Sequence, residues 1–317
     1  MGFALFLISL FTVVELNCEN LFDTQNDSLK QDEEFLPTSD YHWTPYRYWC
    51  KLNRTGQEIL SCGDLETLKI QSLPDLVALI EVENDTVLRD LTKRSLLRQA
   101  GYEYVMTDSP DARGIDVALL YSPFSFRLLN HHSISIPYFE GYKPTRDILY
   151  CAGEVITGDT LHVFVVHAPS RSEGVSATQP YRLLVAERLC QAVDSVRRES
   201  PCARVLVMGD FNDYSVDKSL QLLRDHNLVE VSDSAKGTHG AMATYRWHGE
   251  WGSLDHVFCS GLLTQHLLLC QINDAPFLLE PDKKYGGVKP RRNYLGPRYL
   301  DGYSDHLPLV SVFDLEH

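Results

Sequence analysis

The feature that most constrains the fold is a series of short apolar runs that recur along the whole chain. The runs are rich in Val, Leu and Phe and end at Asn, Asp, Gly, Pro or Ser, as buried strands do. They read FTVVELN, LVALIEV, DVALLYS, LHVFVVHA, RVLVMGDF, LDHVFCS and PLVSVFD. Helix-like stretches lie between them, and the longest, QPYRLLVAERLCQAVDSVRRES, stops at Pro201. This alternation predicts a single α/β domain whose helices cover the faces of its sheets.

Three segments fall outside this pattern, and the domain itself is expected to span residues 12–314. Residues 1–11 are apolar and resemble a signal-peptide core without a basic start or a small-residue cleavage site, so a clipped export signal and an extra strand both fit. This start slightly favours an exported or periplasmic location, and it is too short to span a bilayer as a helix. Residues 23–64 are expected to form an insertion or lid, and residues 315–317 to be the remnant of a purification tag.

Charge and cysteine content narrow the classes of function. The net charge of −14 argues against a protein whose affinity comes from wide contacts with a phosphate backbone, because such surfaces are basic. The net charge is still compatible with a nucleic-acid enzyme that binds its substrate weakly and uses a metal ion to neutralise the local charge. The eight cysteines include no C-x-x-C pair, so a thiolate metal site is not expected, and their disulfide state stays open.

Polar residues at the ends of the apolar runs are the candidate functional groups. Taken alone, an Asp or Asn in such a place is more often a turn former or helix cap than a catalytic group. Recurrence on successive runs is harder to explain that way, because side chains at strand ends can converge on a crevice. Oxygen donors without cysteine suit Mg²⁺, Mn²⁺ or Ca²⁺, and neighbouring imidazoles suit metal-assisted attack of water on phosphorus. The set comprises Asn17, Glu81, His167, Asp210, Asn212, Asp255, Asp305 and His306.

Six segments, in order, resemble the motifs of the endonuclease/exonuclease/phosphatase superfamily of deoxyribonuclease I-like enzymes. They are LNCENL, LIEVEN, VVHAPSR, GDFND, SLDHVF and YSDHLP, and they run from about Thr12 to Asp314. TYRWHGEWGSLDH and EEFLPTSDYHWTPYRYWCKLN are similar to segments of uncharacterised bacterial members. The resemblance implies an α/β (α+β) four-layer sandwich, in which two packed mixed β-sheets are flanked by helices on both outer faces.

The resemblance also implies a role for each strand-end residue. Asp210 would orient or deprotonate the attacking water, and Asn212 would assist at the phosphate. His306 would contact the scissile phosphate. Asp255 would orient the His306 ring, since a buried carboxylate fixes the tautomer of a neighbouring imidazole and favours the imidazolium. The metal site would comprise Glu81, Asn17 and Asp305.

His167 separates branches of the superfamily, because abasic endonucleases usually carry Tyr there, whereas the deoxyribonuclease, sphingomyelinase and phosphatase branches carry His. By resemblance to the deoxyribonuclease branch, Asp108 would be the acidic partner of His167, which gives a second catalytic dyad. The equally weighted alternative is that Asp108 opens a D-S-P turn.

Arginines near the motifs are candidate contacts for the phosphate. The stretch KKYGGVKPRRNYLGPR holds six cationic side chains and no acidic one, and it lies just before Asp305 and His306, so it can overhang the crevice. A solvated charged loop is an even alternative. Arg side chains suit bidentate phosphate contacts. The candidates are Arg113, Arg171, Arg291 and Arg292.

The sequence thus predicts a divalent-metal-dependent phosphodiester hydrolase with Mg²⁺, or Mn²⁺ or Ca²⁺, as cofactor. A nuclease is favoured, with nucleic acid as the phosphoester substrate. The alternative is a phosphatase or phospholipid phosphodiesterase that acts on a polyol phosphate or lipid headgroup, which the acidic balance mildly favours. A non-catalytic binding module ranks low because the polar set is complete. No protein partner and no stable membrane span are expected, and the expected state is a monomer.

Overall fold

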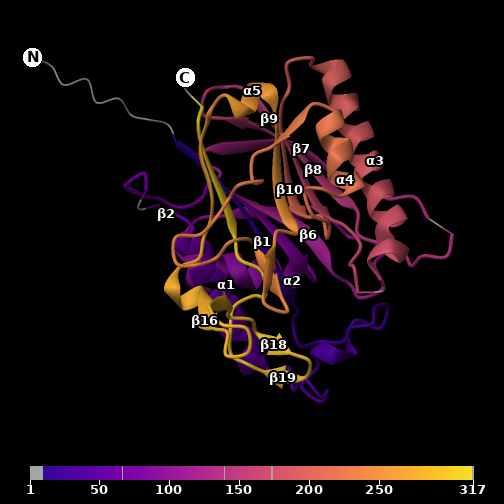
Figure 1. Ribbon diagram of the computed structural model, residues 1–317, viewed down its shortest axis with the longest axis vertical. Helices are drawn as coiled ribbons and strands as arrows, with labels where there is room; N and C mark the ends of the chain where they lie inside the picture. Colours follow the sequence, from indigo (N-terminus) through magenta and orange to yellow (C-terminus); the bar gives the residue numbers. More distant parts are fainter. Residues whose placement is uncertain (1–9, 66, 139, 173, 316–317) are drawn as a thin grey trace, which may run out of the picture.

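The computed structural model describes residues 10–65, 67–138, 140–172 and 174–315. Two six-stranded mixed sheets pack against each other in these residues (Figure 1). The first sheet has the order β15-β20-β1-β4-β6-β5. Its strands are β1 (Leu10–Leu21), β4 (Leu76–Val82), β5 (Glu103–Met106), β6 (Asp116–Tyr121), β15 (Leu267–Ile272) and β20 (Leu309–Asp314).

The second sheet has the order β11-β14-β10-β9-β8-β7. Its strands are β7 (Phe126–Ile134), β8 (Ile148–Val155), β9 (Thr160–His167), β10 (Arg204–Asp210), β11 (Leu228–Glu230) and β14 (Asp255–Ser260). Short hairpins project from the sandwich and pair β2 (Asp64–Leu65) with β3 (Ile70–Gln71), β12 (Tyr245–Trp247) with β13 (Glu250–Gly252), β16 (Leu279–Pro281) with β17 (Val288–Pro290), and β18 (Tyr294–Leu295) with β19 (Arg298–Tyr299).

Helices cover both outer faces, which completes the four layers that the sequence resemblance implied (Figure 1). The long helices are α1 (Pro45–Ser61) and α2 (Asp85–Lys93) over the first sheet, and α3 (Val175–Glu199) and α4 (Lys218–Asp225) over the second. The shorter ones are α5 (Gly261–Thr264), η1 (Glu33–Phe35), η2 (Leu96–Gln99) and η3 (Pro276–Leu278). No helix in the described part of the chain has the length and apolarity needed to cross a membrane.

Each central strand contributes to two hydrophobic layers, because successive side chains of a strand point to opposite faces. In β1, Val13 faces the second sheet, whereas Val14 lies under α1 and α2. In β10, Met208 packs between the sheets and Val207 packs under α3 and α4. Strands buried on both faces read as continuous apolar runs, which explains the sequence pattern.

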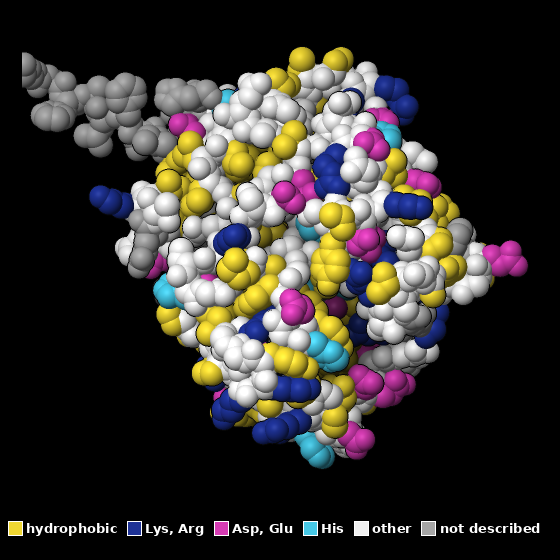
Figure 2. Space-filling view, viewed as in Figure 1, with side chains coloured by type: hydrophobic (Ala, Val, Ile, Leu, Met, Phe, Trp, Pro, Cys, Tyr) yellow, Lys and Arg dark blue, Asp and Glu magenta, His cyan; other side chains and the backbone are white. Residues whose placement is uncertain are grey.

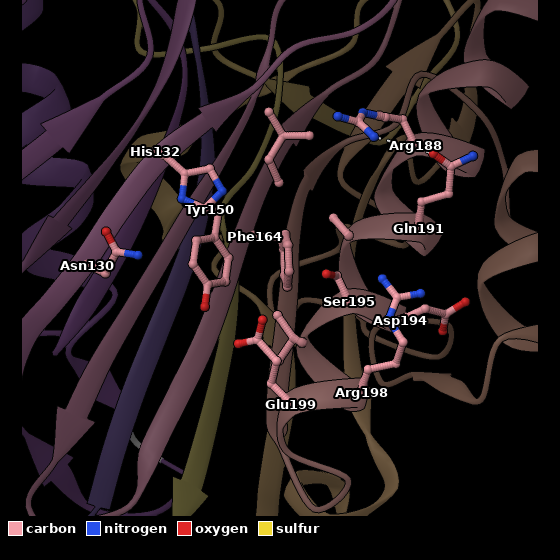
Figure 3. Close-up of a pocket in the computed structure, with 13 residues that line it drawn as sticks. Asn130, His132, Tyr150, Phe164, Arg188, Gln191, Asp194, Ser195, Arg198 and Glu199 are labelled. Atoms are coloured by element: carbon pink, nitrogen blue, oxygen red, sulfur yellow. Dashed lines mark hydrogen bonds between the residues drawn. The ribbon is translucent and has the colours of Figure 1, made fainter.

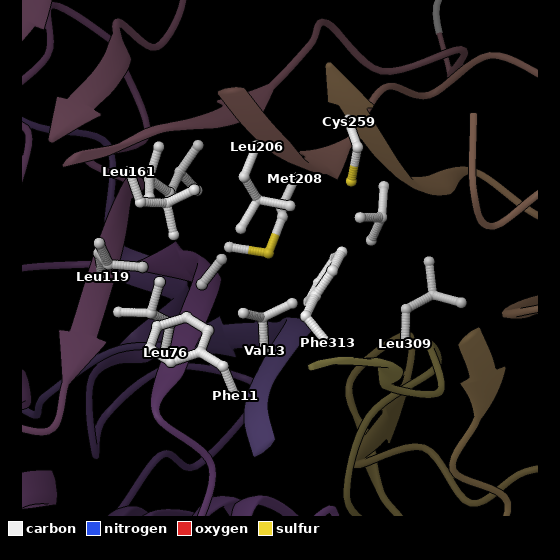
Figure 4. Close-up of a cluster of buried hydrophobic side chains, with 14 of the residues drawn as sticks. Phe11, Val13, Leu76, Leu119, Leu161, Leu206, Met208, Cys259, Leu309 and Phe313 are labelled. Carbon is white, nitrogen blue, oxygen red and sulfur yellow. The ribbon is translucent and has the colours of Figure 1, made fainter. Parts of the chain in front are cut away.

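The layer between the sheets is the inter-sheet core, and both sheets supply it with closely packed side chains (Figure 4). A Leu or Phe buried in this way contributes about 1.5–3 kcal/mol relative to an exposed position. The inter-sheet core therefore fixes how the ends of the two sheets face each other. Its members include Phe11, Val13, Leu76, Leu119, Leu161, Leu206, Met208, Cys259, Leu309 and Phe313.

Strand pairing brings the polar ends of the strands together. In the first sheet, β1 runs parallel to β4, with Asn17 opposite Ile80. In the second sheet, β10 runs parallel to β9 and antiparallel to β14, so Asp210 has His167 on one side and Asp255 on the other. The polar residues that follow the apolar runs therefore meet at one end of the sandwich.

The structure corrects the expected segment boundaries. The predicted insertion or lid at 23–64 contains α1, whose Leu52 and Ile59 are buried against the first sheet, so this part is one of the covering layers. Strand β1 begins at Leu10 rather than at 12, and the expectation for residues 1–9 lies outside the described residues. Leu315 is buried in the inter-sheet core, and residues 316–317 lie outside the described residues.

Candidate active site

A crevice of about 600 Å³ opens where the ends of the two sheets meet. Nine of the predicted site residues line it, and Asn17 and Asp255 lie directly behind them in hydrogen-bond contact with lining residues. Asp108 and Arg291 are not among the lining residues. The nine are Glu81, Arg113, His167, Arg171, Asp210, Asn212, Arg292, Asp305 and His306.

His306 and Asp255 form a buried pair. Nδ1 of His306 lies 2.7 Å from Oδ2 of Asp255, and the backbone N–H of His306 donates to Oγ of Ser304, whose hydroxyl donates to the carbonyl of Asn17. Burial lowers the pKa of His306, but the Asp255 carboxylate outweighs it, with a smaller contribution from Asp210, and the pKa rises well above its ordinary value. His306 is therefore held as an imidazolium near neutral pH.

Asp210 is held by two hydrogen bonds at the end of β10. Its Oδ2 accepts from Nδ2 of Asn17 at 3.1 Å, and its Oδ1 accepts from the backbone N–H of Asn212 at 2.8 Å. Burial raises the pKa of Asp210 to about 7; the neighbouring Asp255 adds to this rise and His306 opposes it. A carboxylate with a pKa near neutrality is suited to accept a proton from water.

Glycine is required immediately before Asp210. A Cβ atom at Gly209 would lie 1.9 Å from the carbonyl oxygen of Val166 in β9, and its φ is +152°. Beyond the strand, Asn212 has a φ of 50° and its Nδ2 donates to the carbonyl of Ala168 at 3.1 Å. The turn therefore ties the end of β10 to the end of β9 while Phe211 points into the core under α3 and α4.

Four carboxylates, Glu19, Glu81, Asp210 and Asp305, line the crevice. Oε2 of Glu81 accepts from the backbone N–H of Asn20 at 2.9 Å, and Glu81 itself has a φ of 65°. Burial raises the pKa of Glu19 to about 7, and the charge of Asp305 adds to the rise. Repulsion among buried carboxylates is what a bound cation would relieve, and an all-oxygen donor set suits Mg²⁺, Mn²⁺ or Ca²⁺.

Asn17 and Asp305 have further partners that bear on their predicted metal roles. Oδ1 of Asn17 accepts from the backbone N–H of Glu19 at 2.9 Å, so Asn17 positions Asp210, and its place at a metal stays a prediction. Asp305 pairs with Arg292 at 3.0 Å. Asp210, Asp255 and His306 bring three potential ligand atoms close together. Because Nδ1 of His306 and Oδ2 of Asp255 are hydrogen-bonded to each other, we do not assign a metal site to this group.

His167 is buried, and its Nε2 lies 3.9 Å from Oε1 of Glu81 and 3.8 Å from Oδ2 of Asp210. Burial lowers the pKa of His167 well below its ordinary value, and the charges of Arg146 and Arg113 add to this effect, so the imidazole is neutral at pH 7. Its Nδ1 has no hydrogen-bond partner among the described residues.

The predicted pairing of Asp108 with His167 is wrong. Asp108 is exposed and borders a separate hollow with Asp27, Lys30 and Glu83. The hydroxyls of its two neighbours, Thr107 and Ser109, both donate to Asp116. Asp108 is not among the residues that line the crevice with His167.

The predicted arginines divide into two groups. Arg113, Arg171 and Arg292 line the crevice, where Arg171 lies over the ring of Tyr214 at 4.3 Å. Arg291 instead donates to the carbonyl of Asp301 at 3.1 Å, outside the crevice, so its predicted substrate contact is not supported.

Sequence reasoning missed several residues of the site, among them Glu19, Trp247, Arg146 and Glu15. Arg146 lines the crevice and is buried; its Nη2 donates to the carbonyl of Ala168 at 2.8 Å and its Nη1 pairs with Asp111 at 3.2 Å. No motif surrounds Arg146, so no sequence signal marks it. Glu15 is buried behind Asp255, and burial, followed by the charge of Asp255, raises its pKa well above the ordinary value. A single Glu inside the apolar run FTVVELN is the visible signal for it.

A second hollow of about 680 Å³ lies between β7, β8 and β9 on one side and α3 on the other (Figure 3). His132, Tyr150, Arg188 and Glu199 are among its lining residues. None of the predicted site residues lines this hollow, whereas nine of them line the strand-end crevice. The strand-end crevice is therefore the candidate active site.

Solved structures with the same fold cover nearly all of this chain. They include a mannosyl-6-phosphatase from Bacteroides thetaiotaomicron, at 15% identity and a TM-score of 0.62, with 95% of this chain and 98% of that chain covered. The human Nocturnin catalytic domain has 18% identity and a TM-score of 0.56, with 96% and 93% covered. Truncated Caenorhabditis elegans TDP2 has 16% identity and a TM-score of 0.53, with 96% and 98% covered.

At these identities the likeness shows the fold alone. None of the curated proteins matches the chain. The sequence model of the Endonuclease/Exonuclease/phosphatase family, however, matches residues 12–315, and the protein therefore belongs to this family.

Proposed function

We propose that the protein is a divalent-metal-dependent hydrolase of small phosphate esters. The observation that carries this proposal is the environment of Asp210, a buried carboxylate set between His167 and the pair of His306 with Asp255 at the end of the crevice. A carboxylate with a raised pKa beside an imidazolium is the combination that attack of water on a phosphate requires.

In the proposed reaction, Asp210 accepts a proton from water as the water oxygen bonds to phosphorus and the ester P–O bond breaks. The departing oxygen takes a proton from solvent and leaves as the alcohol, and Asp210 then releases its proton to solvent. His306, kept cationic by Asp255, holds the non-bridging oxygens as their charge develops, and the neutral His167 donates a hydrogen bond to the phosphate. Asn17 keeps Asp210 in place through its amide. A divalent cation held by Glu81 and Asp305 would supply a Lewis acid that neutralises the charge of the phosphate.

The shape and charge of the molecule favour a small substrate over a polymer. A crevice of about 600 Å³ has the size of a small-molecule site. Of the predicted basic loop, Arg292 alone lines the crevice, while Lys289 pairs with Glu280 at 3.1 Å. On the face seen in Figure 2, Lys and Arg side chains stand in small groups among acidic and apolar ones, without a broad basic area that a duplex would need.

The proposed substrate, a small phosphate ester, differs from the nucleic acid that the sequence favours. One solved structure with the same fold is a mannosyl-6-phosphatase, a phosphatase named for a sugar phosphate. That likeness supports a small phosphate ester as the substrate here. The nuclease stays the alternative, and a panel of substrates separates the two.

The test is a hydrolysis panel with Mg²⁺, Mn²⁺ or EDTA on the wild type and on Asp210→Asn. Substrates are hexose 6-phosphates, nucleoside 5′-monophosphates, glycerol phosphate, bis-p-nitrophenyl phosphate, supercoiled DNA and RNA. We expect turnover of a monoester that is lost in EDTA and in the variant, and retained in Asp108→Asn, a matched exposed control. Cleavage of DNA or RNA in preference to the monoesters would replace the proposal by the nuclease, and turnover that survives in Asp210→Asn would overturn the assigned chemistry.

A further inference from the structure

Trp247 stands at the rim of the candidate active site. Its side chain lines the crevice and is 58% exposed, although Trp is one of the residues that gain most from burial. A large aromatic side chain left exposed beside a set of polar catalytic groups is the usual composition of a ligand pocket, in which apolar surface binds the body of the ligand and polar groups orient it.

The hairpin that carries Trp247 is firmly anchored. The side chain of Arg246, the middle residue of β12, is buried and donates from Nε to the carbonyl of Gly249 at 3.0 Å and from Nη2 to the carbonyl of Gly286 at 2.8 Å. Arg246 also pairs with Asp282 at 3.4 Å and lies 5.4 Å from the ring of Trp251. The exposed ring is therefore presented by a fixed support and not by a free loop.

One side of the Trp247 ring is already covered. The ring of His248 stacks on it, with centroids 4.6 Å apart and an interplanar angle of 10°. Behind His248, Gly249 has a φ of +89°, and a Cβ there would lie 2.8 Å from Tyr285. His248 is not among the residues that line the crevice, whereas Trp247 is, so the part of the indole that His248 leaves uncovered is available to a ligand there.

The distance between Trp247 and the catalytic groups follows from the geometry of the strand. Tyr245, two residues earlier in β12, packs on the His306 ring at a centroid distance of 4.9 Å, and its backbone forms an isolated bridge with His306. Residues i and i+2 of a strand lie on the same face, roughly 6–7 Å apart. If His306 holds the phosphate group of a substrate, Trp247 can therefore contact a substrate ring that is joined to this phosphate through one methylene group.

Other residues that line the crevice are both polar and apolar. Ser170 and Ser172 supply hydroxyls, and Val175 is 43% exposed. Arg171 lies over Tyr214 and contributes a flat cationic surface. A lining that combines hydroxyl groups with an exposed aromatic side chain suits a ring that has an apolar face and polar edges.

We propose that Trp247 is the stacking subsite for the alcohol part of the substrate, so that the protein selects phosphate monoesters of ring-bearing alcohols over those of acyclic ones. The shared chemistry is a ring joined to a primary phosphate, which a hexose 6-phosphate and a nucleoside 5′-monophosphate both provide. This inference rests on the proposed function, which concerns the phosphate end of the same crevice.

The kinetic test compares Trp247→Ala and Trp247→Phe with the wild type. The substrates are mannose 6-phosphate, a nucleoside 5′-monophosphate and glycerol 3-phosphate. Stacking on an aromatic side chain contributes about 1–3 kcal/mol, so the Ala variant should raise KM for the ring-bearing substrate about ten-fold or more. The Phe variant should restore most of the affinity, kcat should stay within about three-fold, and kinetics on glycerol 3-phosphate should not change. Phe124→Ala, at a side chain 88% exposed and outside the crevice, is the control.

Binding to Asp210→Asn, measured by calorimetry with the same three compounds, separates this inference from the proposed function. Tighter binding of one ring-bearing compound, lost on adding Trp247→Ala, supports the subsite even if the wild type turns over none of them, and it tells a sugar from a nucleobase. Equal binding of ring-bearing and acyclic compounds, or an Ala variant that loses affinity equally for all three, overturns it.

Discussion

The Nδ1–H of His306 donates to Oδ2 of Asp255 at 2.7 Å, and both side chains are buried beside Asp210. The hydrogen bond commits Nδ1 to the protein interior and leaves Nε2 for the crevice that His306 lines. It also decides the charge of the ring, because burial alone would favour neutral imidazole. The pair therefore determines both the orientation of His306 and the pH range in which its ring is cationic.

Asp255→Asn should shift the pH dependence of the enzyme. Burial lowers the pKa of His306 and Asp255 raises it by more, so removal of the carboxylate leaves burial dominant and the pKa falls. We expect kcat/KM to drop roughly 100-fold or more and its alkaline limb to move to lower pH. A pH–rate profile on the best substrate of the panel measures both. An alkaline limb that stays in place would show that His306 does not set it.

Asp210→Asn should abolish turnover and at the same time stabilise the fold above neutral pH. The pKa of Asp210 rises from 3.8 to about 7 on folding, so the folded state holds this proton more tightly than the unfolded state does. Stability is then lost as the pH rises through that range, and the variant avoids the loss. The Tm of the variant should exceed that of the wild type at pH 8 and should not exceed it at pH 4. Asp108→Asn, which removes an exposed carboxylate, should leave both differences near zero.

Divalent cations should stabilise the wild type in the absence of substrate. Burial raises the pKa values of Asp210 and Glu19, and neighbouring carboxylates add to the rise; a cation in the crevice would favour the ionised form of both groups. At about 100 times its dissociation constant it would add about 2.7 kcal/mol of stability. Thermal melts with Mg²⁺ or Mn²⁺ and with EDTA measure the shift, and Glu81→Gln should reduce it strongly. An equal shift in wild type and variant would remove Glu81 from the metal site.

Glu58 offers a test of buried charge away from the crevice. It lies on the inner face of α1, and burial raises its pKa from 4.5 to about 8, with the nearby Lys51 opposing the rise. Since the folded state keeps this proton, stability falls as the pH rises from about 4.5 to about 8, by a few kcal/mol at about 1.4 kcal/mol per unit. Glu58→Gln should therefore raise Tm at pH 8 and leave it almost unchanged at pH 4. The exposed Glu34→Gln is the control, and a constant difference at both pH values would contradict the assignment.

The strand ends of the site were predictable from the sequence, whereas several contacts made by loops were not. Asp210 and His167 terminate apolar runs, and the parallel pairing of β9 with β10 brings such ends together without any loop information. The direction of Asp108 depends instead on two neighbouring hydroxyls that bond to Asp116, a local choice that the D-S-P pattern leaves open. The sequence pattern alone therefore could not show that Asp108 lies outside the crevice.

Long-range contacts explain the remaining differences. Arg146 reaches the crevice because its guanidinium bonds to Ala168 and Asp111, which lie 22 and 35 residues away in the sequence. Arg291 and Arg292 are adjacent in a basic stretch, yet Glu19 and Asp305 draw Arg292 into the crevice while Asp301 holds Arg291 outside. A pattern of charges along the chain cannot distinguish two such neighbours.

The inter-sheet core determines how the candidate active site would be lost when the protein is heated or its packing is weakened. The first sheet carries Asn17 and Glu81, and the second carries His167, Asp210 and Asp255, so each sheet alone supplies only part of the candidate active site. A small rotation of one sheet against the other would separate these parts while every strand stayed paired within its own sheet. Heating, or a substitution at Met208 that leaves a cavity, should thus abolish activity before circular dichroism shows a loss of secondary structure. Activity would then report on the packing of one sheet against the other.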